Sequence, residues 1–277
     1  MRPGAVRLIV AELDRAHGFY EGTVGLETIE RSRGLAVLGA GQVPVVELVE
    51  RPDAPARPRR STGLFHLAIL VPSRADLALA LRRITRAGWS LTGASDHLVS
   101  EALYLSDPDG NGIEIYRDRP REEWTYAGGQ LRMETLPLDL NGLLGELEGR
   151  KRAASRMAPE TRMGHVHLNV SDLEQSESFY RGVLGFDVTV RGYPGALFLS
   201  VDGYHHHIGL NTWAGVGAPP PPPGALGLER FELLVDGERR LEALEQMLED
   251  AGFDAERDDA GVHTADPSGN GILLKAK

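Results

Sequence analysis

No cysteine occurs among the 277 residues of the chain. Disulfides, thiolate-held zinc and iron–sulfur clusters are therefore excluded, and any metal must be bound by histidine and carboxylate side chains. A basic surplus is also missing, because 30 Lys and Arg face 40 Asp and Glu, for a formal net charge of -10. Nucleic acids and anionic membranes attract clustered positive charge, so neither is an expected partner.

Long apolar runs are missing as well. The sequence has no apolar stretch of about 18 residues and no signal-peptide pattern of a charged start, an apolar middle and a small-residue cleavage site. We therefore expect a cytoplasmic protein. Its length allows two domains of ordinary size, each with a core of its own.

The chain contains internal repeats. The stretches VRLIVAELDRAHGFYEGTVGL (6–26) and VHLNVSDLEQSESFYRGVLGF (166–186) are identical at eight of 21 positions without a gap. Unrelated sequences would share only about one or two at ordinary residue frequencies. The stretches 63–89 and 227–253 both read as a strand followed by an amphipathic helix that ends at Ala-Gly.

The repeats divide the chain into four modules that begin strand–helix and continue with short strands and Gly-rich turns. We predict an N-terminal pair over 1–118, a linker with a short helix over 119–163, and a C-terminal pair over 164–277. The modules span residues 5–50, 63–118, 164–212 and 227–277.

Two copies of one turn differ at a single informative position. SDPDGNGIEIY (106–116) and ADPSGNGILLK (265–275) share the frame Asp-Pro-x-Gly-Asn-Gly-Ile, but Glu114 in the first copy corresponds to Leu273 in the second. A carboxylate that is kept in one copy and replaced by a hydrocarbon in the other indicates a role beyond the turn itself.

Strand alternation places histidines on one face of the third module's first strand. In HVHLNV, Val166, Leu168 and Val170 form the apolar face, which leaves His165 and His167 on the other. That second face is either solvated or lines a pocket. In module two, His66 stands alone in FHLAILV, and a lone histidine on an apolar strand is more often a satisfied core residue than a ligand.

The stretches GHVHLNVSDLEQSESFYRGVLGF, FHLAILVPSRADL and YLSDPDGNGIEIY resemble the vicinal oxygen chelate superfamily of glyoxalases, bleomycin-resistance proteins and extradiol dioxygenases. SEALYLSDPDGNGIE and GYHHHIGLN are similar in particular to bacterial two-domain catechol 2,3-dioxygenase-like proteins. The resemblance implies an α+β fold, in which four βαβββ modules form two cupped mixed sheets. Each active cup of this family holds one divalent metal.

The resemblance also implies the metal ligands, which come from first strands and a closing strand. Pairing module one with two and three with four would leave two incomplete sites. Pairing two with three and one with four gathers one complete ligand set, and we predict this arrangement. The active cup then holds His66, Glu114 and His165, whereas the other cup has Ala5, Arg230 and Leu273.

Two histidines and one carboxylate leave three metal positions open, which suits Fe(II) or Mn(II) with a diol and dioxygen. The family pattern assigns the acid–base role to His206, although strand alternation from Gly209 would favour His207. Tyr104 corresponds to a hydrogen-bond donor to the bound diol or oxygen, and His97 to a histidine several residues before it. Gly209 occupies the position of a fourth ligand in glyoxalases.

The sequence therefore predicts an Fe(II)-dependent extradiol dioxygenase acting on an aromatic diol. A homodimer is compatible with the resemblance, because dimers are common in this superfamily. Two alternatives remain at this stage: a metal-dependent isomerase or lyase of the glyoxalase kind, and a non-catalytic resistance protein that sequesters small molecules. Ortho- and para-diols both remain open as substrates.

Overall fold

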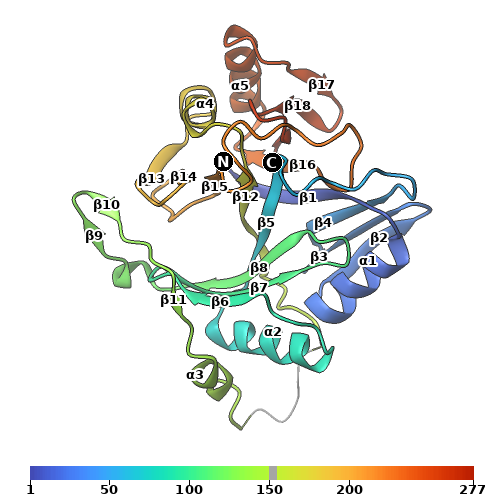
Figure 1. Ribbon diagram of the computed structural model, residues 1–277, viewed down its shortest axis with the longest axis vertical. Coiled ribbons are helices and arrows are strands. Elements are labelled where there is room, and N and C mark those ends of the chain that lie inside the picture. The colour runs from blue at the N-terminus through green and yellow to red at the C-terminus, as the bar shows by residue number, and fades with distance from the viewer. Residues whose placement is uncertain (150–154) are drawn as a thin grey trace. The chain divides into compact units, whose positions relative to one another are not determined.

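The computed structural model of the protein describes residues 1–149 and 155–277 (Figure 1). The chain forms two compact units. Unit 1 comprises Met1–Ile9, Ala54–Phe65 and Gly164–Lys277, and unit 2 comprises Val10–Asp53 and His66–Met163. Among the described residues, no helix combines the length and the apolar character needed to cross a membrane.

The first two modules have the predicted order of one strand, one helix and three strands. A π-helical turn (Tyr20–Val24) extends the first helix. The elements of these modules are β1 (Arg2–Val10), α1 (Leu13–Phe19), β2 (Glu27–Ser32), β3 (Leu35–Ala40), β4 (Val43–Glu50), β5 (Gly63–Leu70), α2 (Arg74–Arg86), β6 (Gly93–Asp96), β7 (Ser100–Ser106) and β8 (Gly112–Asp118).

The last two modules repeat this order. A π-helical turn (η3, Ser178–Val183) again follows the first of their helices, as the sequence repeat predicts. The elements are β12 (Arg162–Asn169), α4 (Leu173–Glu177), β13 (Asp187–Val190), β14 (Ala196–Ser200), β15 (Ile208–Asn211), β16 (Gly227–Val235), α5 (Glu238–Asp250), β17 (Glu256–Asp258), β18 (Gly261–Ala265) and β19 (Gly271–Ala276).

The strands form two mixed sheets, so the predicted α+β fold of four repeated modules is confirmed. Strands of modules one and four belong to a sheet of eight, and strands of modules two and three belong to a sheet of nine. Within unit 1, β1 pairs with β16 in an antiparallel register that sets Val6 opposite Phe231 and Arg7 opposite Arg230. Module one is thus joined to module four, as predicted.

In unit 2, α2 packs on β7 and β8, as Figure 1 also shows. Ser73 caps the helix by accepting a hydrogen bond from the backbone N–H of Asp76. Leu77, Leu81 and Ile84 recur at helical spacing and are buried, and each such side chain contributes about 1.5–3 kcal/mol of apolar burial. This packing covers one face of the sheet, and the other face carries the site described below.

The two copies of the Asp-Pro-x-Gly-Asn turn are built alike. In module two, Asp107 accepts hydrogen bonds from the backbone N–H groups of Asp109 (2.9 Å) and Asn111 (2.8 Å), from the Asn111 amide (2.9 Å) and from the Tyr20 hydroxyl (3.1 Å). In module four, Asp266 accepts the corresponding bonds from Ser268, Asn270 and Tyr180. The shared frame is therefore a structural device that holds the start of each closing strand.

Residues 119–149 continue unit 2 with short elements. Strand β11 (Leu136–Pro137) pairs with β6. Helix α3 (Leu140–Gly145) lies within residues 119–163, for which a linker with a short helix was predicted, and Asp139 caps it. The remaining elements are η2 (Arg121–Glu123), β9 (Tyr126–Ala127) and β10 (Gln130–Leu131).

Candidate functional site

One face of the unit 2 sheet carries an imidazole and a carboxylate predicted as ligands. β5 and β8 run parallel, with Ala68 beside Glu114. Alternation along β5 brings His66 to the same face as Ala68. Nε2 of His66 is 3.0 Å from Oε2 of Glu114, and the two residues are only 7% and 3% exposed. Burying a carboxylate costs free energy unless it is paired. In this pair a nitrogen and an oxygen that can each bind a metal lie close together, as two ligands of one metal must.

The sheet surface beside the His66–Glu114 pair is apolar. Ala68, Leu70, Ala102 and Tyr116 form a buried cluster, and Tyr104 packs against it. The antiparallel register of β7 and β8 sets Tyr104 opposite Glu114, and the Tyr104 ring centroid is 5.7 Å from that of His66. The predicted catalytic tyrosine therefore lies beside both predicted ligands of unit 2.

His97 lies in the turn between β6 and β7 and contacts Tyr104. Its Nε2 is 2.7 Å from the Tyr104 hydroxyl, and its Nδ1 is 2.7 Å from the backbone carbonyl oxygen of Glu134. A carbonyl oxygen can only accept, so Nδ1 carries a proton, and in the neutral ring Nε2 then accepts the hydrogen bond that the Tyr104 hydroxyl donates.

Unit 1 contains the other predicted ligand within a group of histidines. His165 in β12 is buried, and its ring centroid is 4.1 Å from that of His206 and 6.1 Å from that of His205. Nδ1 of His205 is 2.8 Å from Nδ1 of His206. One of these two Nδ1 atoms must carry a hydrogen and donate it, and the other must accept.

The choice between His206 and His207 depends on the loop that precedes β15. His206 packs on His165, whereas Nδ1 of His207 is 3.1 Å from the Ser200 hydroxyl oxygen and accepts from the Val201 N–H at 3.3 Å. The contact with His165 supports His206. Residues 205–207 do lie in a loop, but His205 and His206 are buried, so they are not a surface cluster.

Gly209 lies directly beside the buried imidazole ring of His167. In the parallel pair of β12 and β15, Gly209 lies beside His167, and a Cβ on Gly209 would be 2.8 Å from Cγ of His167. The His167 ring in turn contacts the rings of Phe65, Phe198 and Trp213, with centroids 5.0–5.7 Å away. His167 is therefore a packed aromatic-cluster residue, and its ring occupies the space that a larger side chain at 209 would need.

The second ligand-like set of the repeat carries no metal-binding side chain. Ala5 and Leu273 are buried in unit 1, and the backbone N–H of Ala5 donates to the Glu232 carboxylate at 3.1 Å. Glu232 lies beside Leu273 in the parallel pair of β16 and β19. Alanine, leucine and the guanidinium of Arg230 offer no ligand for a divalent cation.

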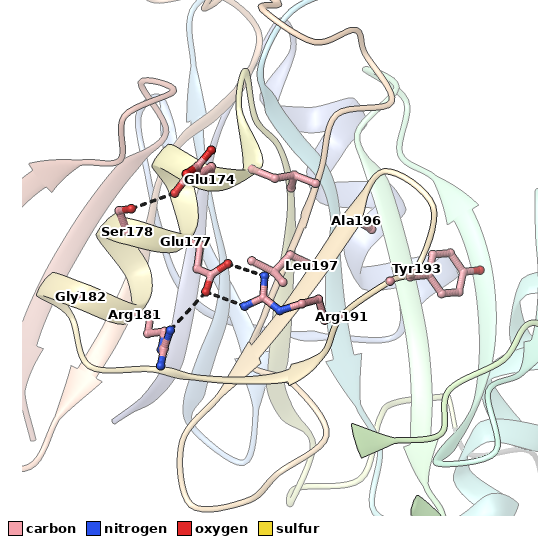
Figure 2. A pocket seen from close by; sticks show the side chains of 11 residues that line it. Glu174, Glu177, Ser178, Arg181, Gly182, Arg191, Tyr193, Ala196 and Leu197 are labelled. Carbon is pink, nitrogen blue, oxygen red and sulfur yellow. Dashed lines mark hydrogen bonds and ion pairs between the residues drawn. The ribbon is translucent and has the colours of Figure 1, made fainter. Parts of the chain in front are cut away.

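A hollow of about 820 Å³ lies elsewhere on unit 1, between α4–η3 and the β13–β14 hairpin (Figure 2). Arg191 donates to both carboxylate oxygens of Glu177 at 2.6 and 2.8 Å across it. The hydrogen bonds from Arg191 lower the pKa of Glu177 despite its partial burial. Its described lining includes none of the predicted site residues, and we assign it no catalytic role.

Two contributors were missed at the level of sequence. The Glu134 carbonyl fixes the His97 ring, but a backbone oxygen leaves no signal in the residue types. Asp96 supports the turn that carries His97 by accepting a hydrogen bond from the Leu98 N–H. Its position directly before His97 was the one sequence feature that pointed to this role.

Comparison with known proteins gives the family. The model for the Glyoxalase/Bleomycin resistance protein/Dioxygenase superfamily matches residues 2–115 and 162–274. The chain belongs to this superfamily.

A curated relative, the catechol-2,3-dioxygenase of Bacillus subtilis (strain 168), is 43% identical over 269 residues, which cover 95% of this chain and 93% of the relative. The chain is an enzyme of the same catechol 2,3-dioxygenase-like kind, as predicted.

Solved structures confirm the fold. A structure from Bacillus subtilis subsp. subtilis str. 168 matches with a TM-score of 0.71 and 13% identity, covering 100% of this chain and 85% of that one. Glyoxalase I from Zea mays matches with a TM-score of 0.61 and 18% identity, covering 99% and 92% of the respective chains.

Proposed function

We propose that the protein is an Fe(II)-dependent extradiol dioxygenase that cleaves a catechol-type aromatic diol with dioxygen. The observation that carries this proposal is the 43% identity, over nearly the whole chain, to a protein named catechol-2,3-dioxygenase. The buried His66–Glu114 pair at 3.0 Å is the local feature that supports it.

We propose His66, Glu114 and His165 as the metal ligands. Each is buried and could offer one ligand atom. Two imidazoles and one carboxylate fit Fe(II), with Mn(II) as the second choice, and such a set leaves positions open for substrate. The bound metal would supply a site for both diol oxygens and pass electron density from the ring to dioxygen.

The chain's own residues then orient the substrate and move its protons. His206 is proposed as the acid–base residue because it packs on His165, and a positioned histidine contributes about 10²–10⁴-fold. The oxygen of Tyr104 is proposed to contact the bound diol. The apolar cluster beneath Tyr104 keeps water from the same face.

Catalysis is tested by mixing Fe(II)-loaded protein with catechol in air, recording the yellow ring-opened semialdehyde and oxygen uptake. We expect one dioxygen consumed per diol. His206→Phe should keep the metal and lose about 10²–10⁴-fold in kcat, whereas Glu114→Gln should lose both metal and activity.

Three experimental outcomes would contradict the proposed function or its ligand assignment. A panel of ortho- and para-diols that yields neither product nor oxygen uptake, while methylglyoxal–thiol adducts are isomerised, would establish the glyoxalase-type alternative. Tight binding of an aromatic compound by metal-free protein without turnover would establish the resistance-protein alternative. Full activity in Glu114→Gln at matched metal loading would overturn the ligand assignment.

A further inference from the structure

The turn that carries His97 has an uncommon backbone conformation. Leu98 has a φ of +68°, in the left-handed region that non-glycine residues rarely adopt. The Asp96 carboxylate stabilises this conformation by accepting a hydrogen bond from the Leu98 N–H at 2.9 Å. The backbone N–H of Arg119 donates to the Val99 carbonyl at 2.8 Å. The His97 N–H also donates to the Ser100 carbonyl at 2.8 Å across the turn. Asp96 is therefore one of several contacts that hold the turn, and it is the one that binds the Leu98 N–H.

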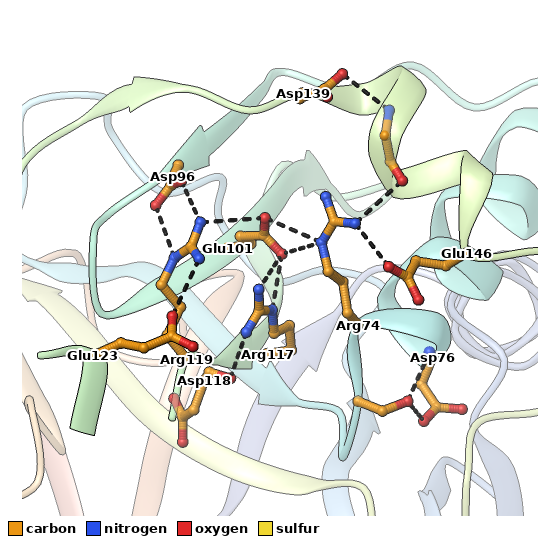
Figure 3. Close-up of polar contacts among 12 residues, drawn as sticks. Arg74, Asp76, Asp96, Glu101, Arg117, Asp118, Arg119, Glu123, Asp139 and Glu146 are labelled. Atoms are coloured by element: carbon orange, nitrogen blue, oxygen red, sulfur yellow. Dashed lines mark hydrogen bonds and ion pairs between the residues drawn. The ribbon is translucent and has the colours of Figure 1, made fainter. Parts of the chain in front are cut away.

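Asp96 is itself fixed by a network of charges (Figure 3). Arg119 donates to Oδ2 of Asp96 at 2.6 Å and to Oδ1 at 3.3 Å. The same guanidinium is 3.5 Å from the Glu101 carboxylate. Glu101 is buried and also accepts from Arg74 at 2.9 Å and from Arg117 at 2.8 Å.

The network keeps Asp96 ionised. Burial acts to raise the pKa of Asp96, but the hydrogen bonds from Arg119 and from the Leu98 N–H outweigh burial and lower it. A charged acceptor binds a backbone N–H more strongly than a neutral one. The carboxylate is therefore well suited to hold a strained turn at neutral pH.

The turn delivers His97 to a defined contact. Because the Glu134 carbonyl accepts from Nδ1, the Nε2 atom of His97 accepts from the Tyr104 hydroxyl. The Tyr104 proton is thereby directed toward His97. A change in the turn would move His97 and release the Tyr104 hydroxyl.

We infer that Asp96 is a positioning residue for the proposed reaction: its carboxylate fixes the β6–β7 turn so that His97 holds the Tyr104 hydroxyl in place beside the predicted ligands. The catalytic consequence rests on the proposed function, whereas the effect on His97 does not. Asp96 acts through Leu98 and His97 and needs no contact with substrate.

The first test is nitrogen NMR of the His97 ring in ¹⁵N-histidine-labelled wild-type protein, assigned with His97→Gln. We expect the form protonated at Nδ1 alone, and a shift of the Nε2 signal in Tyr104→Phe. A wild-type ring protonated at Nε2, with or without a proton on Nδ1, would overturn the inference. This measurement requires neither turnover nor the folding of an Asp96 variant.

The second test uses Asp96→Ala, with Asp96→Asn as the conservative replacement that keeps an acceptor for Leu98. Small misplacements near a reacting centre cost up to about 10²-fold, so Asp96→Ala should lower kcat about 10- to 100-fold, with KM changed less than about threefold. Asp96→Asn should retain most of kcat. In Asp96→Ala the ring signals should average between the two neutral forms.

Glu123→Gln is the matched control. Glu123 is the exposed partner of the same Arg119, at 3.5 Å, and lies outside the β6–β7 turn. It should leave kcat and the His97 signals unchanged. If wild-type protein turns over and Asp96→Ala matches it in kcat and ring signals, the positioning role is wrong while the proposed function stands. If wild-type protein does not turn over, the ring signals alone decide the inference.

Discussion

A Cβ atom on Gly209 would lie 2.8 Å from Cγ and 3.0 Å from Cδ2 of His167. The His167 ring cannot withdraw easily, because Phe65, Phe198 and Trp213 surround it. Because Gly209 has no side chain, the His167 ring of β12 fits beside it. A glutamate ligand at this position would first have to displace an imidazole.

We expect Gly209→Ala to lower the free energy of unfolding by about 1–3 kcal/mol, as overpacking of a filled core does. His167→Ala should relieve the clash, so the double variant should be more stable than the sum of the single effects predicts. Urea unfolding of the four proteins measures this coupling.

Gly182→Ala is the control for Gly209→Ala. Gly182 lies in the π-helical turn η3, and a Cβ there would meet nothing within 4 Å. It should be neutral or slightly stabilising. Additive effects of the substitutions at 167 and 209 would show that the predicted clash is absent.

Of the three proposed ligands, Glu114 could be singled out from the sequence, because Leu273 replaces it in the other copy of the turn. His66 and His165 were predicted as ligands only through the family resemblance. The choice between His206 and His207 was not predictable, because both lie in a loop where strand alternation gives no direction. Asp96 and the Glu134 carbonyl act across the fold, and their partners are known only once β6, β7 and β11 are placed together.

At the scale of elements, each copy of the duplicated turn is hydrogen-bonded to a helical segment of another module. The turn of module two contacts the π-helical turn of module one, and the turn of module four contacts that of module three. Tyr20 and Tyr180 both donate to a buried aspartate, at 3.1 Å in each case. Burial raises the pKa of Asp107 and of Asp266, although the hydrogen bonds from their asparagines oppose this. The aspartates therefore depend on a full set of donors.

Tyr20→Phe and Tyr180→Phe should each lower the free energy of unfolding by about 1.5–3 kcal/mol, the range for a hydrogen bond to a charged group. The two values should be similar because the two turns are built alike. Thermal or urea unfolding tests this, with the exposed Tyr126→Phe as a neutral control. A loss confined to one variant would contradict the structural equivalence of the copies.

The order of strands and helices followed from the sequence because each module repeats it. The confirmed α+β fold needed only alternation in the strands, amphipathic periodicity in α2 and α5, and glycine-rich turns. The short elements between residues 119 and 149 were less predictable. Strands of two residues, such as β9, β10 and β11, carry no periodic pattern.

At the scale of the whole molecule, the four modules yield one predicted metal site. The first-strand positions of modules one and four hold Ala5 and Arg230, and the closing-strand position of module four holds Leu273. We expect about one divalent ion per chain by elemental analysis of anaerobically purified protein, falling to none in Glu114→Gln.

Leu273→Glu should leave the metal content and activity unchanged and lower stability, because it buries a second carboxylate beside Glu232. Leu273→Gln is the uncharged control, and the difference between the two measures the cost of the charge. A second bound ion in Leu273→Glu would show that the predicted inactive set can be rebuilt with one ligand.

The Asp107 and Asp266 turns have a consequence for how such a chain diverges. Each turn is held by its own asparagine, its own backbone and one tyrosine, and none of these is a proposed ligand. After a duplication, one copy could therefore lose its chemistry by drift while its architecture stayed under selection. Because the turn contacts do not depend on the ligand positions, new binding residues can be introduced by design around Leu273 without rebuilding the strand that carries them.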